Sequence, residues 1–408
     1  MRETKSEESI SSFRWMVLAC FMFVALLSQL FWLTFAPITS EVVKLFNVSP
    51  FEVSLLSLVW PLVFVVLAIP VGFFIDKKGF KISVGIGALL LAIFSVFRIF
   101  STIPDYNYSV LLISQTGAAI SQPFIFGCIT KIAINWFSEK DQGLATGLGT
   151  IGLFIGMMLA LAITPFLFLS VGITKMLMIY ALISCAGAFF FIFFAKERKV
   201  ATITDETSAF NLKNLWELSK LKGFIIIEFG FFVVVGGFTA IMTWLEQFLS
   251  SLHGISIDQA GIIGGLMIIG GIIGSIIIPA ISDRVNKIKP FVLLDLAIGT
   301  LAVFLIGSFD SFILLGLIFF IGGFFLMSAL PLVLEISSRI SGPGMEGRAS
   351  SLLWFFSQVG SVLLIAIVDP VYSLWGSYYH SILLIVILWL ISFLLFLTMK
   401  EVKRSIKT

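Results

Sequence analysis

The stretch Gly72-Phe-Phe-Ile-Asp76-Lys77-Lys78-Gly79-Phe80-Lys81 directly follows a long apolar run, and it has a counterpart in the second half of the chain. The counterpart, Pro279-Ala-Ile-Ser-Asp283-Arg284-Val-Asn-Lys287, also follows a long apolar run. In each stretch a residue that disfavours helices is followed, after three more residues, by an aspartate and a cation. This recurrence indicates that the chain consists of two similar halves.

A second pair of sites repeats with the same spacing. Gly143 precedes Gly156 in the first half by the same number of residues as Gly347 precedes Gly360 in the second half. Small residues at matching depths of apolar segments allow helices to approach closely in a membrane. The register therefore predicts two six-helix halves related as parallel repeats.

The composition places the chain in a membrane. Of its 408 residues, 59% are hydrophobic and 12% are charged, and the mean hydropathy is +1.10. A soluble protein carries about 25% charged residues. Apolar runs long enough to cross the hydrocarbon layer recur along the whole sequence. These values exclude a soluble enzyme, a nucleic-acid binder and a disordered scaffold, and they predict an all-α polytopic membrane protein.

Charged or Pro/Gly-rich breaks divide the chain into spans and a linker. We predict twelve spans, at 15–46, 52–75, 82–103, 109–135, 143–168, 173–195, 223–251, 257–281, 291–308, 312–338, 348–371 and 378–399. The expected domains are two six-helix bundles, 1–195 and 223–408, joined by the polar linker 196–222. Apolar residues within 210–221 are spaced as in an amphipathic helix lying on the membrane surface.

The distribution of basic residues predicts the topology. An even number of spans puts both termini on one side of the membrane. Of 26 lysine and arginine residues, only Lys44, Arg98 and Lys175 lie at span ends facing the other side. The positive-inside rule therefore predicts cytoplasmic termini. We expect a multi-pass protein of the plasma membrane.

The stretch 72–81 also follows the signature Gly-x-x-x-Asp-Arg/Lys-x-Gly-x-Lys/Arg, and in this the chain resembles the major facilitator superfamily. The resemblance implies a transporter whose two bundles open alternately to the two sides of the membrane. Physically, Asp76 can bond the free amides at the start of the span at 348–371, and Asp283 those of the span at 143–168. These contacts would hold the cytoplasmic side shut.

The charges near this side form the predicted gating set. Its members are Asp76, Lys77, Asp283, Arg284, Lys131 and Glu335. On the repeat register Lys131 corresponds to Glu335, and we hypothesise that Glu335 pairs with Arg284. The alternative is that the loop charges are simply solvated and that the cations only set the topology.

The span centres are nearly free of charge, which limits the substrate. Glu228 and Asp295 lie only a turn or two from span ends, so an anionic substrate is disfavoured and a proton relay is weakly disfavoured. The remaining candidates for binding are aromatic, amide and hydroxyl side chains: Trp32, Gln358, Gln122, Phe154, Phe238 and Thr239, with Gln29, Phe31 and Trp354. Aromatic faces attract an ammonium group through cation–π contacts. The set therefore suits a small organic cation, although packing and interhelical hydrogen bonds are the alternative roles.

A narrower resemblance is to the feline leukaemia virus subgroup C receptor-related branch of that superfamily, whose members carry choline and ethanolamine and have been proposed to move haem. It rests on these matching pieces: Arg14-Trp15 with Trp32, Ser121-Gln122-Pro-Phe-Ile-Phe-Gly127 with Trp136-Phe137, Gly323-Phe324-Phe325 with Leu330-Pro331-Leu332 and Glu335, and Ser351-Leu352-Leu353 with Gln358-Val359. The resemblance implies that Trp32 and Gln358 contact the substrate. The chain departs from the family at Phe154, where a glutamine is expected, and near Phe238 or Thr239, where a tyrosine is expected. The alternative is therefore a carrier for another solute, such as haem, a drug-like amphiphile or an organic acid, whose transport is coupled to protons or sodium ions or is uncoupled.

The sequence lacks the residue clusters that an enzyme or a metal site requires. The two histidines, His253 and His380, are far apart, and no acids cluster, so neither an enzyme nor a metal site is expected, and no cofactor. The loops are too short for a receptor. The three cysteines are expected to be small buried hydrophobic residues: Cys20, Cys128 and Cys185. We expect a monomer that has lipid and a small-molecule substrate, but no nucleic acid, as its partners.

Overall fold

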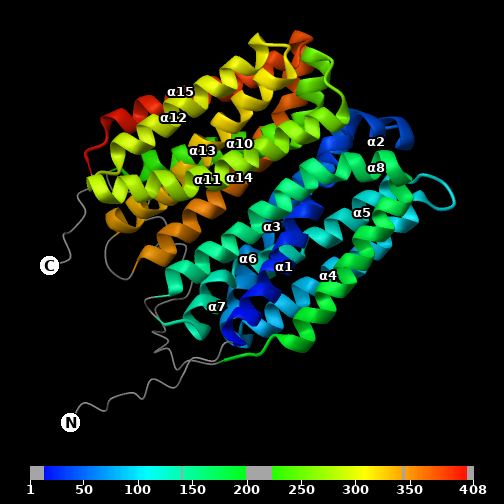
Figure 1. Ribbon diagram of the computed structural model, residues 1–408, viewed down its shortest axis with the longest axis horizontal. Helices are drawn as coiled ribbons and strands as arrows, with labels where there is room; N and C mark the ends of the chain where they lie inside the picture. The colour runs from blue at the N-terminus through cyan, green and yellow to red at the C-terminus, as the bar shows by residue number, and fades with distance from the viewer. Residues whose placement is uncertain (1–12, 139–140, 199–222, 342–344, 402–408) are drawn as a thin grey trace.

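The computed structural model describes residues 13–138, 141–198, 223–341 and 345–401, with the backbone alone for 346–348. All regular structure in these ranges is helical. Figure 1 shows two helical bundles side by side, α1 to α8 and α10 to α15, which we name the N-terminal and C-terminal bundles. The end of the bundles where α1 begins and α15 ends is called the near end. The end that carries α2 is called the far end.

The N-terminal bundle contains the first half of the described helices. They are α1 (Phe13–Leu33), η1 (Ala36–Ile38), α2 (Thr39–Phe46), α3 (Pro50–Lys78), α4 (Phe80–Ile99), η2 (Phe100–Thr102), α5 (Tyr108–Ala119), α6 (Ser121–Phe126), α7 (Ile129–Trp136) and α8 (Gln142–Phe194). The C-terminal bundle contains α10 (Phe224–His253), α11 (Ile257–Val285), α12 (Lys289–Leu305), η4 (Ile306–Ser308), α13 (Phe312–Ser341), α14 (Glu346–Trp375) and α15 (Tyr378–Thr398).

The helix α8 accounts for two of the predicted spans. Eleven described helical segments are long and apolar enough to cross a membrane, and α8 has 53 residues. At 1.5 Å per residue it is far longer than a hydrocarbon layer of about 30 Å. Gly172 breaks it with φ 76° and ψ 168°, a conformation that a glycine adopts without steric cost. The described chain therefore makes twelve crossings, as predicted.

Two predicted spans are interrupted. The span predicted at 15–46 consists of α1, η1 and α2, with Pro37 at the start of η1. The span predicted at 109–135 consists of α5, α6 and α7, with breaks at Ile120, three residues before Pro123, and at Gly127. Proline lacks a backbone N–H and disfavours a continuous helix before it. The remaining spans differ from prediction by a few residues at their ends.

The repeated glycines take the same position in both bundles. A Cβ atom on Gly156 of α8 would collide with the Leu26 carbonyl oxygen of α1. A Cβ atom on Gly360 of α14 would collide with the Phe232 carbonyl oxygen of α10. Each glycine thus sits where the fifth span of its half crosses the first. The equivalence supports the repeat register that the sequence predicted.

We expect Gly156→Ala to lower the free energy of unfolding by about 1–3 kcal/mol, because the methyl group forces α1 and α8 apart. Gly147→Ala, in the same helix, is the matched control, since a Cβ atom there meets nothing within 4 Å. Thermal unfolding of both variants in detergent tests this. Equal melting temperatures for the two variants would contradict the crossing geometry.

Burial corrects the prediction for the cysteines. Cys128 is buried, Cys20 is partly buried and Cys185 is exposed. Cys185 shares its exposed face with Phe189 and Phe193, which follow at intervals of one helical turn. A wholly apolar face suits contact with lipid, so an apolar span did not imply an internal position. The amphipathic helix predicted within 210–221 lies outside the described residues, and the domain boundaries remain predictions.

Candidate functional site between the two bundles

The far end is closed around η1. Residues 27–39, which include η1, are buried without interruption. The helix η1 contacts α3 and α8 of its own bundle and α10 and α11 of the other. On the C-terminal side, residues 239–249 of α10 are likewise all buried. The end of α1 and the end of α10 are therefore enclosed by protein at the centre of the far end.

A polar contact joins the bundles next to η1. Glu246 of α10 accepts hydrogen bonds from the Ser40 backbone N–H at 3.1 Å and from the Ser40 hydroxyl at 2.7 Å. Gln247 donates to Glu246 at 2.8 Å and to the Ser40 hydroxyl at 3.0 Å. Only 1% of Glu246 is exposed. We name Ser40, Glu246 and Gln247 the far-end contact.

The two bundles also pack closely where α11 meets α8. A Cβ atom on Gly261 of α11 would meet the Leu161 carbonyl oxygen and the ring of Pro165, both on α8. A Cβ atom on Gly264 would meet the side chains of Leu245 and Leu161, and one on Gly265 would meet the Ala162 side chain. The backbones of the two bundles approach this closely because α11 has no side chains at these positions.

The predicted gating residues lie at the near end, and most of them are exposed. Asp76 and Lys77 end α3, and Asp283 and Arg284 are close to the end of α11, all four exposed. The Asp76 side chain is 74% exposed and pairs with Lys131 at 3.0 Å, within its own bundle. Lys131 also donates to the Ile75 carbonyl at 2.9 Å. In this structure Asp76 thus bonds inside the N-terminal bundle, whereas the predicted latch runs from Asp76 to the other bundle.

The ion pair that the structure gives for Glu335 differs from the hypothesis. Arg339, one turn further along α13, donates to the Glu335 carboxylate through Nη2 at 2.7 Å and Nε at 3.0 Å. The hypothesis paired Glu335 with Arg284. Residues four apart on a helix face each other, so the pair forms within one helix.

The candidate residues for binding come from different helices. Trp32 is buried at the end of α1, and its indole N–H donates to the Ser57 carbonyl of α3 at 3.2 Å. Gln122 and Gln358 are buried, and Phe154 and Phe238 are partly buried. The Oε1 atom of Gln122 has no hydrogen-bond partner within the described residues.

Two candidates share one helix crossing in the C-terminal bundle. Gly236 of α10 lies directly against Gly360 of α14. Thr239 follows Gly236 by three residues, and Gln358 precedes Gly360 by two. The Thr239 hydroxyl donates to the Gly236 carbonyl at 2.7 Å. The hydroxyl hydrogen of Thr239 is therefore bonded within α10. Of the two side chains, Gln358 keeps its hydrogen-bond donors for a solute.

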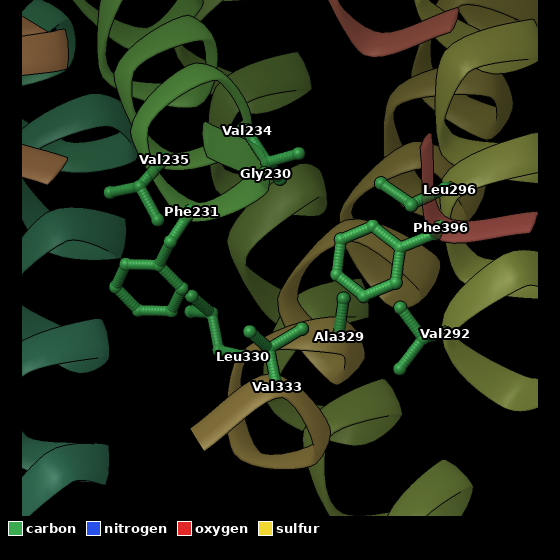
Figure 2. A pocket seen from close by; sticks show the side chains of 10 residues that line it. All are labelled: Gly230, Phe231, Val234, Val235, Val292, Leu296, Ala329, Leu330, Val333 and Phe396. Carbon is green, nitrogen blue, oxygen red and sulfur yellow. The ribbon is translucent and has the colours of Figure 1, made fainter. Parts of the chain in front are cut away.

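A small cavity lies nearby but inside one bundle. Figure 2 shows it between α10, α12, α13 and α15, lined by Gly230, Phe231, Val234, Val235, Val292, Leu296, Ala329, Leu330, Val333 and Phe396. Its volume is about 20 Å³ and its lining is apolar. A space that holds about one water molecule cannot accommodate an organic solute. It is a packing gap and not a binding site.

A family model described as Major Facilitator Superfamily matches residues 21–365. The chain belongs to this superfamily. It is therefore a transporter of small molecules and not an enzyme. The twelve crossings of the described chain agree with the twelve helices of the superfamily fold.

Individual proteins are similar to this chain in sequence or in fold. An uncharacterized protein of Archaeoglobus fulgidus is 38% identical over 55% of this chain and 100% of its own length. A choline/ethanolamine transporter of Danio rerio is 24% identical over 89% of this chain and 79% of its own length. A bacterial homologue of the human lysosomal transporter Spinster, solved in an inward-facing and unoccupied conformation, has a TM-score of 0.73 at 16% identity, covering 95% of this chain and 96% of its own.

Sequence reasoning missed two buried charges of this superfamily member. Arg98 was expected near an exposed end of its span, but it is fully buried in the N-terminal bundle. Its guanidinium donates to Gln115 at 3.2 Å, and its Cζ atom lies 4.1 Å from the centre of the Phe31 ring. One face of Phe31 is thus occupied by Arg98. Glu246 was not singled out at all, because its burial depends on Ser40 in the other bundle.

Proposed function

We propose that the chain carries a small organic cation of the choline or ethanolamine type across the membrane by facilitated diffusion. The observation that carries this proposal is the alignment, over most of the chain, with relatives named as choline/ethanolamine transporters. It is supported by the position of Trp32, whose indole is fixed by Ser57 within the enclosed segment next to η1. A buried, fixed aromatic ring close to η1, which contacts both bundles, suits cation–π recognition of an ammonium group.

In the proposed cycle the two bundles rock about this central region. The far end is closed in the structure, and the near-end charges are exposed. In the alternate state the far-end contact breaks, and Asp76 and Asp283 bond the starts of α14 and α8. Gln358, Gln122, Phe154, Phe238 and Thr239 are proposed to complete the substrate site with Trp32.

We further propose that both termini are cytoplasmic and that the chain acts as a monomer in the plasma membrane. The support is the asymmetric distribution of lysine and arginine along the sequence. With this topology the near end is the cytoplasmic end. The conformation described here is then closed on the extracellular side.

Uptake by purified protein in liposomes tests this proposal. We expect uptake of radiolabelled choline or ethanolamine above that of empty liposomes, in competition with a panel of other ammonium compounds. Carboxylates and neutral solutes of similar size serve as comparison substrates. Uptake of only an organic acid or a neutral amphiphile would refute the proposed substrate class.

Uptake should also persist without a proton or sodium gradient. The proposed site contains aromatic, amide and hydroxyl groups, none of which binds a proton near neutral pH. Initial rates with and without an imposed gradient provide the measurement. Strict dependence on a proton gradient would contradict facilitated diffusion and would direct attention to Asp295, a buried carboxylate on α12, with Asp295→Asn as the next variant.

A further inference from the structure

The Glu246 carboxylate is buried at a contact between the bundles. Its three hydrogen bonds come from Ser40 and Gln247. Within the described residues, no lysine, arginine or histidine forms an ion pair with it. Lys44, on the same short helix as Ser40, pairs with Glu41 at 2.7 Å and is 68% exposed. Within the described residues, Glu246 thus accepts hydrogen bonds only from neutral donors, and the exposed Lys44 attracts it without forming an ion pair.

The buried charge of Glu246 would be stabilised either by exposure to water or by a cation that binds next to it. Removing a carboxylate from water is costly, and hydrogen bonds from neutral groups do not provide the Coulombic attraction that a countercharge would. Separation of the bundles at the far end exposes Glu246 to water. An ammonium group that approaches there gains attraction that a neutral group of equal size does not.

The position of Glu246 puts this charge on the path of the solute. Ser40 follows η1 directly, and η1 contacts helices of both bundles. Residues 239–249 are buried on every side, so this part of α10 lies at the centre of the closed end and not at its lipid-facing rim. A solute that moves between the bundles must pass the point where Ser40 and Glu246 now meet.

We infer that Glu246 is a specificity-determining residue that admits cations at the far end of the path, its carboxylate being released from Ser40 when this end opens. The inference rests on the proposed function and deepens it, since it assigns charge selection to a residue outside the proposed aromatic site. Recognition then has two stages. The carboxylate selects for positive charge, and the site around Trp32 selects for the shape of the ammonium group.

The test compares choline with 3,3-dimethylbutan-1-ol, which has the same shape and no charge. In liposomes, Glu246→Gln keeps the size of the side chain and an acceptor for Ser40 but removes the charge. We expect the KM of choline uptake to rise about tenfold, since a nearby charge in a partly hydrated mouth contributes modestly. Inhibition by the neutral analogue should stay within about twofold of its wild-type value. An unchanged ratio of choline KM to neutral-analogue inhibition would overturn the inference.

Two further variants distinguish the effect of the Glu246 charge from the effect of weakening the far-end contact. Glu41→Gln is the matched control, because it removes a partly exposed charge one residue from Ser40 and should leave the ratio unchanged. Ser40→Ala weakens the far-end contact but keeps the carboxylate, so it should also preserve the preference for choline. A loss of preference in Ser40→Ala equal to that in Glu246→Gln would assign the effect to the seal and refute selection by charge.

Three other outcomes each have a defined meaning. If Glu246→Gln does not give a monodisperse protein, Glu246→Asp and Glu246→Asn replace it, since these two differ in charge at equal length. If the wild type takes up an ammonium compound but neither choline nor ethanolamine, the proposed substrate is wrong, and the inference is decided on that compound and its neutral analogue. If the wild type carries only neutral or anionic solutes, both fail.

Discussion

Trp32→Ala is expected to abolish the thermal stabilisation that choline gives the purified protein and to reduce choline uptake by about 30-fold. A desolvated cation–π contact contributes about 2 kcal/mol or more, and every 1.4 kcal/mol is a factor of ten in affinity. The measurements are the melting temperature with and without choline and the initial rate in liposomes.

Trp32→Phe and Trp15→Ala provide the controls. Phenylalanine keeps an aromatic face but loses the N–H that bonds to the Ser57 carbonyl. Trp15 is exposed near the start of α1 and should be replaceable without effect. If Trp32→Phe loses as much binding as Trp32→Ala, the hydrogen bond to Ser57 and not the ring face is decisive, and the proposed cation site at Trp32 is wrong.

Gly261→Leu is expected to lower uptake tenfold or more by preventing closure of the far end. The added side chain collides with the Leu161 carbonyl oxygen and the ring of Pro165 across the boundary between the bundles. Such overpacking costs about 1–3 kcal/mol, which shifts a two-state equilibrium by about 5- to 150-fold. The state that is open at the far end should then predominate.

Accessibility provides a second measure of this shift. A cysteine at position 40, in a background whose three natural cysteines are replaced by serine, should react faster with a hydrophilic maleimide when Gly261 is leucine. Ile276→Phe is the control, because Ile276 is exposed on the same helix. Normal uptake and unchanged labelling in Gly261→Leu would show that α8 and α11 do not seal the path.

The span boundaries were predictable because the membrane fixes the length of an apolar segment. The helix at Ile257–Val285 begins at the predicted residue, and Gly172 separates two spans where the sequence placed a break. The interruption at Pro123 was not predicted, although the proline is visible. A proline within an apolar span is tolerated in many membrane helices, so its presence did not decide between a kink and a break.

The site was less predictable, because burial of its charges depends on contacts between distant segments. Glu246 lies near the end of a helix, where charges usually mark the membrane surface. It is buried together with the rest of residues 239–249 and is hydrogen-bonded by Ser40, 206 residues away. Arg98 is similarly enclosed by Gln115 and Phe31 from two other helices. The glycine pair Gly156 and Gly360 was found in advance because a repeat appears within the sequence itself.

The break at Gly172 has a mechanical consequence. The fifth and sixth spans are joined there without an intervening loop, so they form a hairpin that has no slack at the far end. The fifth span touches α11, while the hairpin as a whole packs on α4 and α1. Withdrawing one arm from α11 therefore pulls the other arm with it. A separation of α11 from the fifth span at Gly261 is thus expected to move the sixth span, and with it the contacts of the hairpin with α1 and α4.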